Sequence, residues 1–323
     1  MQTTSSQIKS NFRALGILTK SHSAIDQNRL SDYLLQDQAS KLLPHKFRVK
    51  YCLKRKIDKS KNRAVCWNES TQKAHFGNVI RCGSVWICPV CAKKITEKRR
   101  MELASINERW KKGITLYSPV AHDKNFIGPP LFTQEKVQGY TYLITLTNPH
   151  NANDRLCVLR EQQKQAMKKF FSDRKGRYIF DNLLSKRFHV TNYEVTYGQN
   201  GWHPHNHILL LTYNLVANFA DYIPLLAELW IKACTKAGLS APSMKHGLDL
   251  RDGEYASEYV SKWGIESELT KGQVKKGRNG GFTPFDLLQL SMYSETVFEK
   301  YCGKLFQEFA IAMKGARQLV WSR

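Results

Sequence analysis

The feature that most constrains this chain is a pair of β-type runs joined by a short turn. The runs HVTNYEVTY (189–197) and HILLLTY (207–213) are rich in β-branched and aromatic residues, and GQNG (198–201) lies between them. Glycine and asparagine tolerate the positive backbone φ angles that tight hairpin turns require. The sequence therefore predicts that the two runs pair as an antiparallel hairpin.

Three histidines alternate along the strand that follows this turn. GWHPHNHILLL carries His203, His205 and His207 at every second position, so their side chains share one face of the sheet. Antiparallel pairing brings Glu194 of the preceding strand beside His205 and His207. Two imidazoles and one carboxylate can hold a divalent ion as a Lewis acid for a phosphate. A structural or adventitious histidine-rich turn is the alternative interpretation.

Other strands and helices are interspersed along the chain. TYLITLT (141–147) reads as a strand, helical patterns cover 155–171, 224–234 and 254–263, and shorter β-like pieces occupy 47–53, 63–67 and 75–80. We expect an α+β fold with a central antiparallel five-stranded sheet, the histidine strand in its middle and flanking helices against one face.

A cysteine cluster precedes the helical pattern that begins near residue 89. Cys88 and Cys91 form a C-x-x-C, and Cys82 lies upstream. Zinc takes four soft ligands in a tetrahedron, so we expect a structural Zn²⁺ site. Cys52 is our fourth ligand, with Cys66 or His75 as alternatives; a redox C-x-x-C is the rival, but no βαβ pattern precedes it. The isolated cysteines Cys157, Cys234 and Cys302 fit buried core positions.

The chain is strongly basic. Its 50 Lys and Arg residues exceed its 27 Asp and Glu residues, which gives a formal charge of +23 and favours a nucleic-acid partner. A ribosome-associated or membrane-surface protein would share this composition. The expected DNA contacts lie in the basic run 54–63 and after the cysteine cluster: Lys54, Arg55, Lys56, Lys93, Lys94, Arg99 and Arg100. The polar N-terminus resembles no secretory segment, so we expect a cytoplasmic protein without a membrane partner.

The helical pattern EYASEYVSKW places two tyrosines and a lysine on one stripe. Tyr255 and Tyr259 are four residues apart, and Lys262 follows three residues later. Such an aromatic pair is usually core, but a lysine on the same stripe is unusual there. Beside a metal, a tyrosine can act as a nucleophile with the lysine stabilising the transition state.

In chain order, LITLT, WHPHNHILLL and YASEYVSKW resemble the three motifs of the HUH endonucleases, specifically the plasmid rolling-circle replication initiators. The segment CGSVWICPVCAKKI resembles the zinc-binding part of one branch. The resemblance runs from about residue 46 to 290. Some single-tyrosine relatives have a glutamate at the position of Tyr255. The tyrosine in this sequence resembles the two-tyrosine variant instead. Asn206 departs from the bulky hydrophobe that is usual there.

The resemblance implies an HUH endonuclease fold with a small N-terminal zinc-binding subdomain. It implies a metal pair at His205 and His207, a catalytic Mg²⁺ or Mn²⁺, and a nucleophile at Tyr259 assisted by Lys262, with Tyr255 as the second tyrosine. Such an enzyme nicks and rejoins single-stranded origin DNA through a 5′-phosphotyrosine and leaves a 3′-OH primer. The sequence contains no P-loop motif, so we expect a host helicase and DNA polymerase as partners, besides single-stranded and duplex origin DNA.

Two rival functions remain open. A two-tyrosine HUH transposase would share every motif, and a non-catalytic zinc-finger DNA-binding regulator would use only the cysteines and cations. We expect the following units: an accessory or mobile arm at 1–45, a zinc-binding and DNA-binding subdomain at 46–112, a linker at 113–138, the endonuclease domain at 139–290 and a C-terminal helical extension at 291–323.

Overall fold

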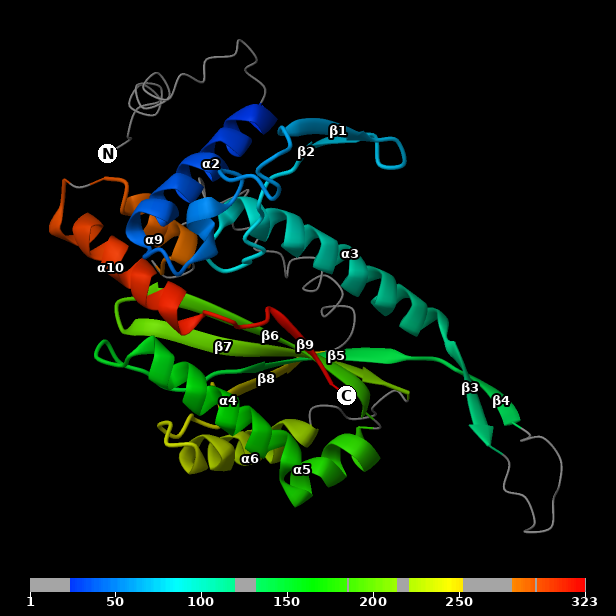
Figure 1. Cartoon of the computed structure of the whole chain (residues 1–323). Coiled ribbons are helices and arrows are strands. Elements are labelled where there is room, and N and C mark those ends of the chain that lie inside the picture. Colours follow the sequence, from blue (N-terminus) through cyan, green and yellow to red (C-terminus); the bar gives the residue numbers. More distant parts are fainter. Residues whose placement is uncertain are drawn as a thin grey trace.

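A computed structural model describes residues 24–119, 132–184, 186–213, 221–251, 281–293 and 295–322. Its centre is a five-stranded antiparallel sheet in the order β8-β5-β7-β6-β9 (Figure 1). The strands are β5 (Tyr140–Leu146), β6 (Lys186–Gly198), β7 (Gly201–Thr212), β8 (Leu248–Arg251) and β9 (Leu319–Trp321). The expected sheet and the central position of the histidine strand, β7, are confirmed.

Side chains of β7 alternate between two apolar layers. Ile208 and Leu210 belong to the large core that includes the helices below the sheet in Figure 1. Leu209 and Leu211 instead cluster with Leu103 and Trp110 of a helix on the other face. Helices therefore lie on both faces rather than one, because β7 is apolar at consecutive positions beyond the histidines.

The lower layer contains α4 (Leu156–Ser172), α5 (Arg174–Tyr178), the π-helical turn η2 (Ile179–Leu183) and α6 (Tyr222–Lys236). Helices α4 and α6 follow the apolar patterns seen in the sequence. Phe170 of α4 meets Trp230 of α6 edge to face, with ring centroids 5.7 Å apart. The Trp230 indole also donates to the Thr147 carbonyl oxygen at 2.7 Å, which fixes α6 to the end of β5.

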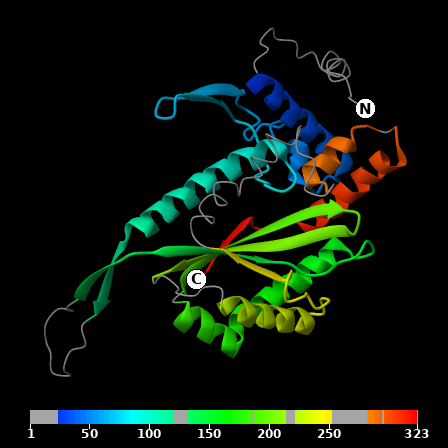
Figure 2. The ribbon, with the colours of Figure 1, turned by 180° about the vertical axis from the view of Figure 1, so that it is seen from behind.

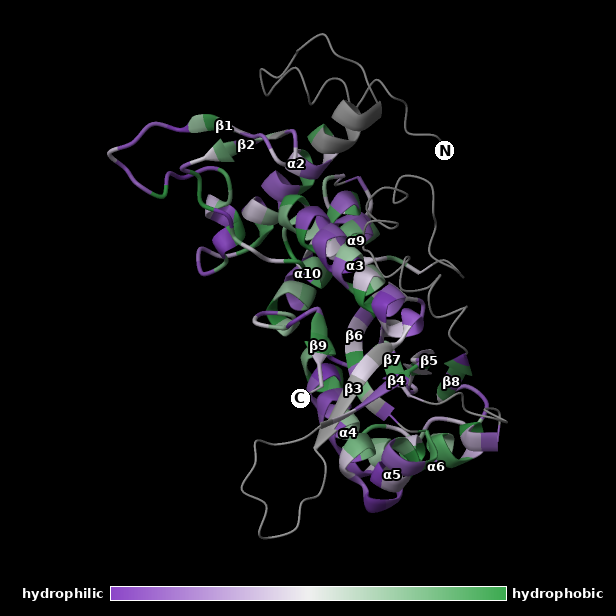
Figure 3. Ribbon diagram, turned by 90° about the vertical axis from the view of Figure 1, so that its right-hand side faces the viewer, coloured by the Kyte–Doolittle hydropathy of each residue, from purple (hydrophilic) through white to green (hydrophobic). Residues whose placement is uncertain are grey.

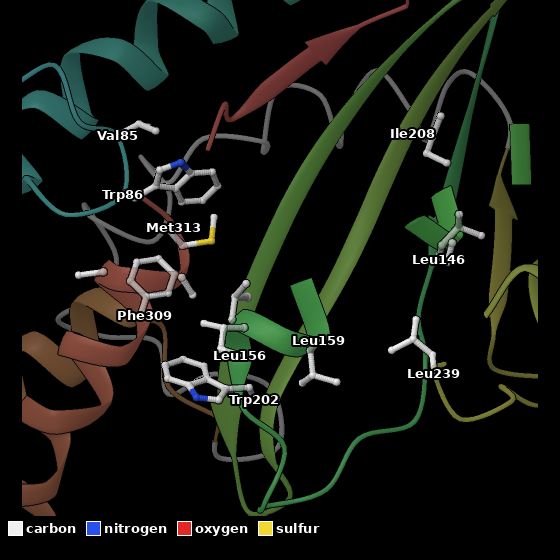
Figure 4. Close-up of a cluster of buried hydrophobic side chains, with 14 of the residues drawn as sticks. Val85, Trp86, Leu146, Leu156, Leu159, Trp202, Ile208, Leu239, Phe309 and Met313 are labelled. Atoms are coloured by element: carbon white, nitrogen blue, oxygen red, sulfur yellow. The ribbon is translucent and has the colours of Figure 1, made fainter. Parts of the chain in front are cut away.

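A second group of helices gathers near the β6–β7 turn: α2 (Ala24–Leu42), α9 (Pro284–Leu290) and α10 (Val297–Ala312). Figure 4 shows Trp86 and Trp202 on either side of Phe309 of α10. The Phe309 ring lies 6.3 Å from Trp86 and 6.2 Å from Trp202, centroid to centroid. The cysteine-bearing segment and the sheet thus share one continuous core.

The described residues nearest the two ends of the chain, from 24 and up to 322, contain segments that pack against the central core. Within the segment expected to be an accessory arm, Leu35 and Ala39 of α2 are buried, and Gln38 donates to the Ser291 carbonyl oxygen at 2.9 Å. Within the expected C-terminal extension, β9 pairs with β6 and completes the sheet. In both segments, short apolar stretches pack against distant parts of the chain, which local patterns do not encode.

The helix α3 (Pro89–Lys112) leaves the cysteine cluster and crosses the sheet towards a projecting hairpin of β3 (Ile114–Pro119) and β4 (Phe132–Val137) (Figures 1 and 2). The segment 113–138, expected to be a linker, contains these two paired strands. Trp110 anchors the end of α3 to the sheet, because its indole nitrogen lies 3.1 Å from the carbonyl oxygens of both Tyr140 and Thr212.

The N-terminal region also holds the short 3₁₀ helix η1 (Arg48–Tyr51) and the hairpin of β1 (Ala64–Asn68) and β2 (Lys73–Gly77). The hairpin matches the β-like pieces at 63–67 and 75–80. The piece at 47–53 is instead a helical turn, which lets Phe47, Val49 and Cys52 all reach the core. None of the helices in the described ranges has the length and apolar character that a membrane span requires.

Candidate metal-dependent active site and cysteine cluster

The β6–β7 hairpin brings three potential metal ligands together on one face. Glu194 stands directly opposite His205 in the register, and His207 follows two residues along the same strand. The two imidazole Nε2 atoms lie 3.1 Å (His205) and 2.9 Å (His207) from the same oxygen, Oε2 of Glu194. The pairing expected from the GQNG turn is therefore the pairing in the structure.

The neighbouring strand β5 orients the more buried histidine. Thr145 is the β5 partner of His207, and its hydroxyl oxygen lies 3.0 Å from Nδ1 of that imidazole. The His207 side chain is 3% exposed, whereas that of Glu194 is 31% exposed. The Glu194 side chain is thus partly exposed, while the His207 imidazole is buried and held from behind.

The charges of this cluster are coupled. Burial by itself raises the pKa of the Glu194 carboxyl, but His205 and the hydrogen bonds from both imidazoles outweigh burial and bring the pKa below its ordinary range. Burial lowers the pKa of His207, and its hydrogen bond to Glu194 opposes that effect. Metal binding would need this ionised carboxylate and would displace the protons that the two imidazole Nε2 atoms share with it.

The ligand spacing fits a divalent ion. Neighbouring ligands of an octahedral ion with bonds of about 2.1 Å lie about 3 Å apart. Both nitrogen–oxygen distances at Glu194 match that value, and the three ligand atoms all lie within 4.8 Å of one another. Three protein ligands would leave coordination positions open, as catalysis on a phosphate oxygen requires.

His203 turns to a different partner. Its ring stacks on His150, which follows β5, with centroids 4.7 Å apart and planes at 21°. Burial, together with the nearby His205 and His150, lowers the pKa of His203 to about 4. His203 is therefore neutral at physiological pH and forms the edge of the site.

Asn206, the departure from the family pattern, has a polar partner on the opposite face. It is buried, and its amide lies 3.4 Å from Oε1 of Gln163 on α4. Gln163 also donates to the Pro204 carbonyl oxygen at 2.9 Å and to Asn148. The polar residue is satisfied behind the histidines, so the strand stays buried without a hydrophobe there.

The cysteine cluster has four sulfurs at tetrahedral spacing. The Sγ atom of Cys91 lies 3.5 Å from that of Cys52 and 3.6 Å from that of Cys82, and Cys88 lies 3.9 Å from Cys52. Sulfurs bonded at about 2.3 Å to one tetrahedral ion stand about 3.8 Å apart. This group of Cys52, Cys82, Cys88 and Cys91 can hold a metal ion.

The surroundings of the cluster favour thiolates at Cys52 and Cys91, whereas contacts with the other thiols and burial raise the pKa of Cys82 and Cys88. The amide of Gln36 donates to Cys88 Sγ at 3.2 Å, and the backbone N–H of Cys82 donates to Cys52 Sγ at 3.4 Å. Hydrogen bonds from Cys82 and Cys88 lower the pKa of Cys52 to about 7. Contacts with the other three thiols also hold the pKa of Cys91 below its ordinary range.

The alternative fourth ligands, Cys66 and His75, lie elsewhere. They are paired across the β1–β2 hairpin, and neither belongs to the groups of metal-binding side chains found in the described part of the chain. Proximity in the fold thus favours Cys52, which sits at the end of η1.

The cations expected to contact DNA have varied surroundings. Lys54 pairs with Asp37 at 2.7 Å and Lys93 with Asp32 at 3.2 Å, while Arg100 pairs with Glu97 within α3. The Arg55 guanidinium lies 4.0 Å from the Tyr51 ring centroid. Lys56, Lys94 and Arg99 complete the set; Lys94 is exposed, and the other two are half-buried.

The tyrosine stripe cannot be placed in this frame, because Tyr255, Tyr259 and Lys262 lie outside the described residues. Sequence reasoning missed Thr145, His150 and Gln163. Thr145 lies inside the strand LITLT, and its facing of His207 could have been found only by assuming that β5 pairs with β7.

The geometry defines a class: an α+β protein with a histidine–carboxylate site at the centre of an antiparallel sheet and a four-cysteine cluster beside it. The chain is similar to "Protein rep" of Streptomyces lividans, with 27% identity over 265 residues that cover 65% of this chain and 53% of that protein. It thus spans about half the length of the curated relative it matches. No family model and no solved structure matches the chain.

Proposed function

We propose that this protein is a rolling-circle replication initiator with an HUH endonuclease fold, which nicks and rejoins single-stranded origin DNA. The observation that carries the proposal is the convergence of His205, His207 and Glu194 on the central strands of the sheet. The similarity to a protein named "Protein rep" supports it independently. The basic composition fits a DNA substrate.

Chemically, Tyr259 would be the nucleophile. Its phenolic oxygen loses its proton and attacks the scissile phosphorus, the bond from phosphorus to the 3′ oxygen breaks, and that oxygen takes up a proton to become the 3′-OH. The product is a 5′-phosphotyrosyl link, which is a phosphodiester like the bond it replaces, so the step is reversible without ATP. Lys262 offsets the charge that develops on the phosphate, and Tyr255 serves the second cleavage.

The described residues would prepare the substrate for this step. His205, His207 and Glu194 would hold Mg²⁺ or Mn²⁺, which supplies Lewis-acid polarisation of the phosphate when bound. Thr145 would keep the His207 ring oriented, and Glu194 is the most exposed of the three side chains. The four cysteines would hold Zn²⁺ and fix the start of α3, whose cations would contact duplex DNA beside the nick. A host polymerase would extend the 3′-OH, and a host helicase would unwind the duplex ahead of it.

The proposal is tested by covalent trapping. The full chain is incubated with Mn²⁺ and single-stranded oligonucleotides from the origin of its own replicon, and adducts are detected on a denaturing gel. We expect an adduct with the wild type, none with Tyr259→Phe, and first cleavage without rejoining for Tyr255→Phe. The outcome that contradicts the proposal is a wild type that binds the oligonucleotide but forms no adduct. Cleavage only at transposon ends would indicate a transposase instead.

A further inference from the structure

The β1–β2 hairpin exposes an apolar face that the proposed nicking chemistry does not use. Val65 is 71% exposed, Trp67 58% and Phe76 52%. Val65 stands directly opposite Phe76 in the register, and Trp67 is two residues further along β1, so all three side chains share one face. The opposite face carries Cys66 and His75. Figures 1 and 3 show that the hairpin projects away from the sheet and the helices.

A structured basic loop lies at the base of this hairpin. Asn78, directly after β2, has a positive φ of 52°, and its side-chain amide donates to the carbonyl oxygens of Asp58, Lys61 and Asn62 at 2.9, 2.8 and 3.3 Å. Its side-chain oxygen accepts from the Asp58 N–H at 2.8 Å. The basic run 54–63 is thus folded around one side chain and held beside the strands.

The charge of this region matches a polyanion. Residues 54–77 contain seven Lys or Arg and two Asp or Glu. One of those acids, Asp58, accepts from the Ser60 hydroxyl and pairs with Lys61 at 3.5 Å. An exposed aromatic face next to a concentration of positive charge is the combination with which proteins bind single-stranded nucleic acid, since phosphates meet the cations and bases stack on the rings.

We propose that the β1–β2 hairpin is a binding platform for unpaired bases of DNA, with Trp67 and Phe76 as the stacking surfaces. The inference rests on the proposed function, because a nicking enzyme needs its origin strand unpaired and held. A paired duplex offers no free base faces to stack on these rings. The platform would therefore select the melted part of the origin, while the loop 54–63 holds the phosphates that flank it.

The test is equilibrium binding of the full chain to a labelled oligothymidylate of about 16 nucleotides, a typical single-strand site size. Binding is compared with an abasic strand of equal length and with a duplex, in buffer without added divalent ion. Stacking of one base on an aromatic ring corresponds to a roughly 5- to 150-fold change in affinity. We expect Trp67→Ala to weaken binding to the oligothymidylate by that factor, and Trp67→Phe to retain most of the wild-type affinity. The affinity for the abasic strand and for the duplex should change little in either variant.

Trp321→Ala is the matched control, because Trp321 is an exposed tryptophan on β9 of a different sheet. Unchanged zinc content and circular dichroism would show that Trp67→Ala folds normally. The assay requires no cleavage, so a protein that never nicks DNA could still support the platform. Three outcomes would overturn the proposal. Trp67→Ala could bind oligothymidylate as tightly as the wild type, or it could lose the same affinity for the abasic strand. It could also lose self-association while it keeps its binding to DNA.

Discussion

The hydroxyl oxygen of Thr145 lies 3.0 Å from Nδ1 of His207, whose Nε2 faces Glu194 on the other side of the ring. The two residues are partners across β5 and β7. An imidazole that binds a metal through Nε2 carries its proton on Nδ1 and donates it to a second group. The Thr145 hydroxyl oxygen is placed to accept that hydrogen bond, so Thr145 is a positioning residue for the proposed metal site.

We therefore expect Thr145→Val to lower Mn²⁺ affinity by about 10- to 100-fold, the usual cost of losing such a partner. Valine keeps the shape and strand propensity of threonine but cannot accept the hydrogen bond from Nδ1 of His207. Calorimetric titration with Mn²⁺ measures the effect, and Thr145→Ser, which keeps the hydroxyl, should bind nearly as the wild type does. Equal affinities for Thr145→Val and wild type would remove this role.

The cysteine cluster predicts different effects for two cysteines near β1. Cys52→Ser should release about one Zn²⁺ per chain and lower the melting temperature, because structural zinc contributes folding free energy directly. Cys66→Ser should keep both the zinc and the stability, since Cys66 lies on the hairpin. Elemental analysis and thermal unfolding of the two variants measure this difference. Zinc retained by Cys52→Ser but lost from Cys66→Ser would mean that the assignment is reversed.

Close packing around Gly139 predicts that adding one methyl group at this position lowers the free energy of unfolding. A Cβ atom at this position would collide with the indole of Trp110, whose nitrogen contacts two carbonyl oxygens, and with the Trp110 backbone. We expect Gly139→Ala to destabilise the protein by about 1–3 kcal/mol, as overpacking does. Gly198→Ala is the control, since among the described residues its Cβ would meet only Gly281, at 4.0 Å. Chemical denaturation compares the two; similar free energies of unfolding would contradict the packing argument.

His189 predicts a pH effect on stability. Burial, with a smaller contribution from Lys186, lowers the pKa of His189 to about 4, and its ring stacks on Phe171 at 4.2 Å. A depressed pKa means that the neutral form is favoured in the folded state. Its contribution is present above the unfolded pKa of about 6.5 and is lost as the pH falls towards 4.

We expect the wild type to lose about 2 kcal/mol through this group between pH 7 and pH 5. His189→Phe can still stack on Phe171 but cannot titrate, so its stability should fall less over that interval. Urea unfolding of both proteins at the two pH values gives the difference. Parallel pH profiles would show that His189 is not the responsible group.

Local patterns determined the central hairpin. The strand period of two fixes which residues share a face, and the GQNG turn fixes the register, so Glu194, His205 and His207 were brought together from 14 consecutive residues. Helix α3, which crosses the sheet, was equally predictable, because it begins at Pro89 within the C-x-x-C and continues through the expected cationic stretch. These features depend on neighbours in the chain, and the sequence states them directly.

Only the tertiary structure decided the long-range relationships. The choice of Cys52 over Cys66 depends on η1 turning Cys52 towards the C-x-x-C, and the placing of Thr145 depends on β5 pairing with β7 across 62 residues. The fifth strand, β9, comes from the end of the chain and pairs with β6 although its three residues carry almost no signal of their own. Contacts between distant segments are selected by the summed burial of the whole core. No local periodicity records that sum, which is why these residues had to be found in the fold.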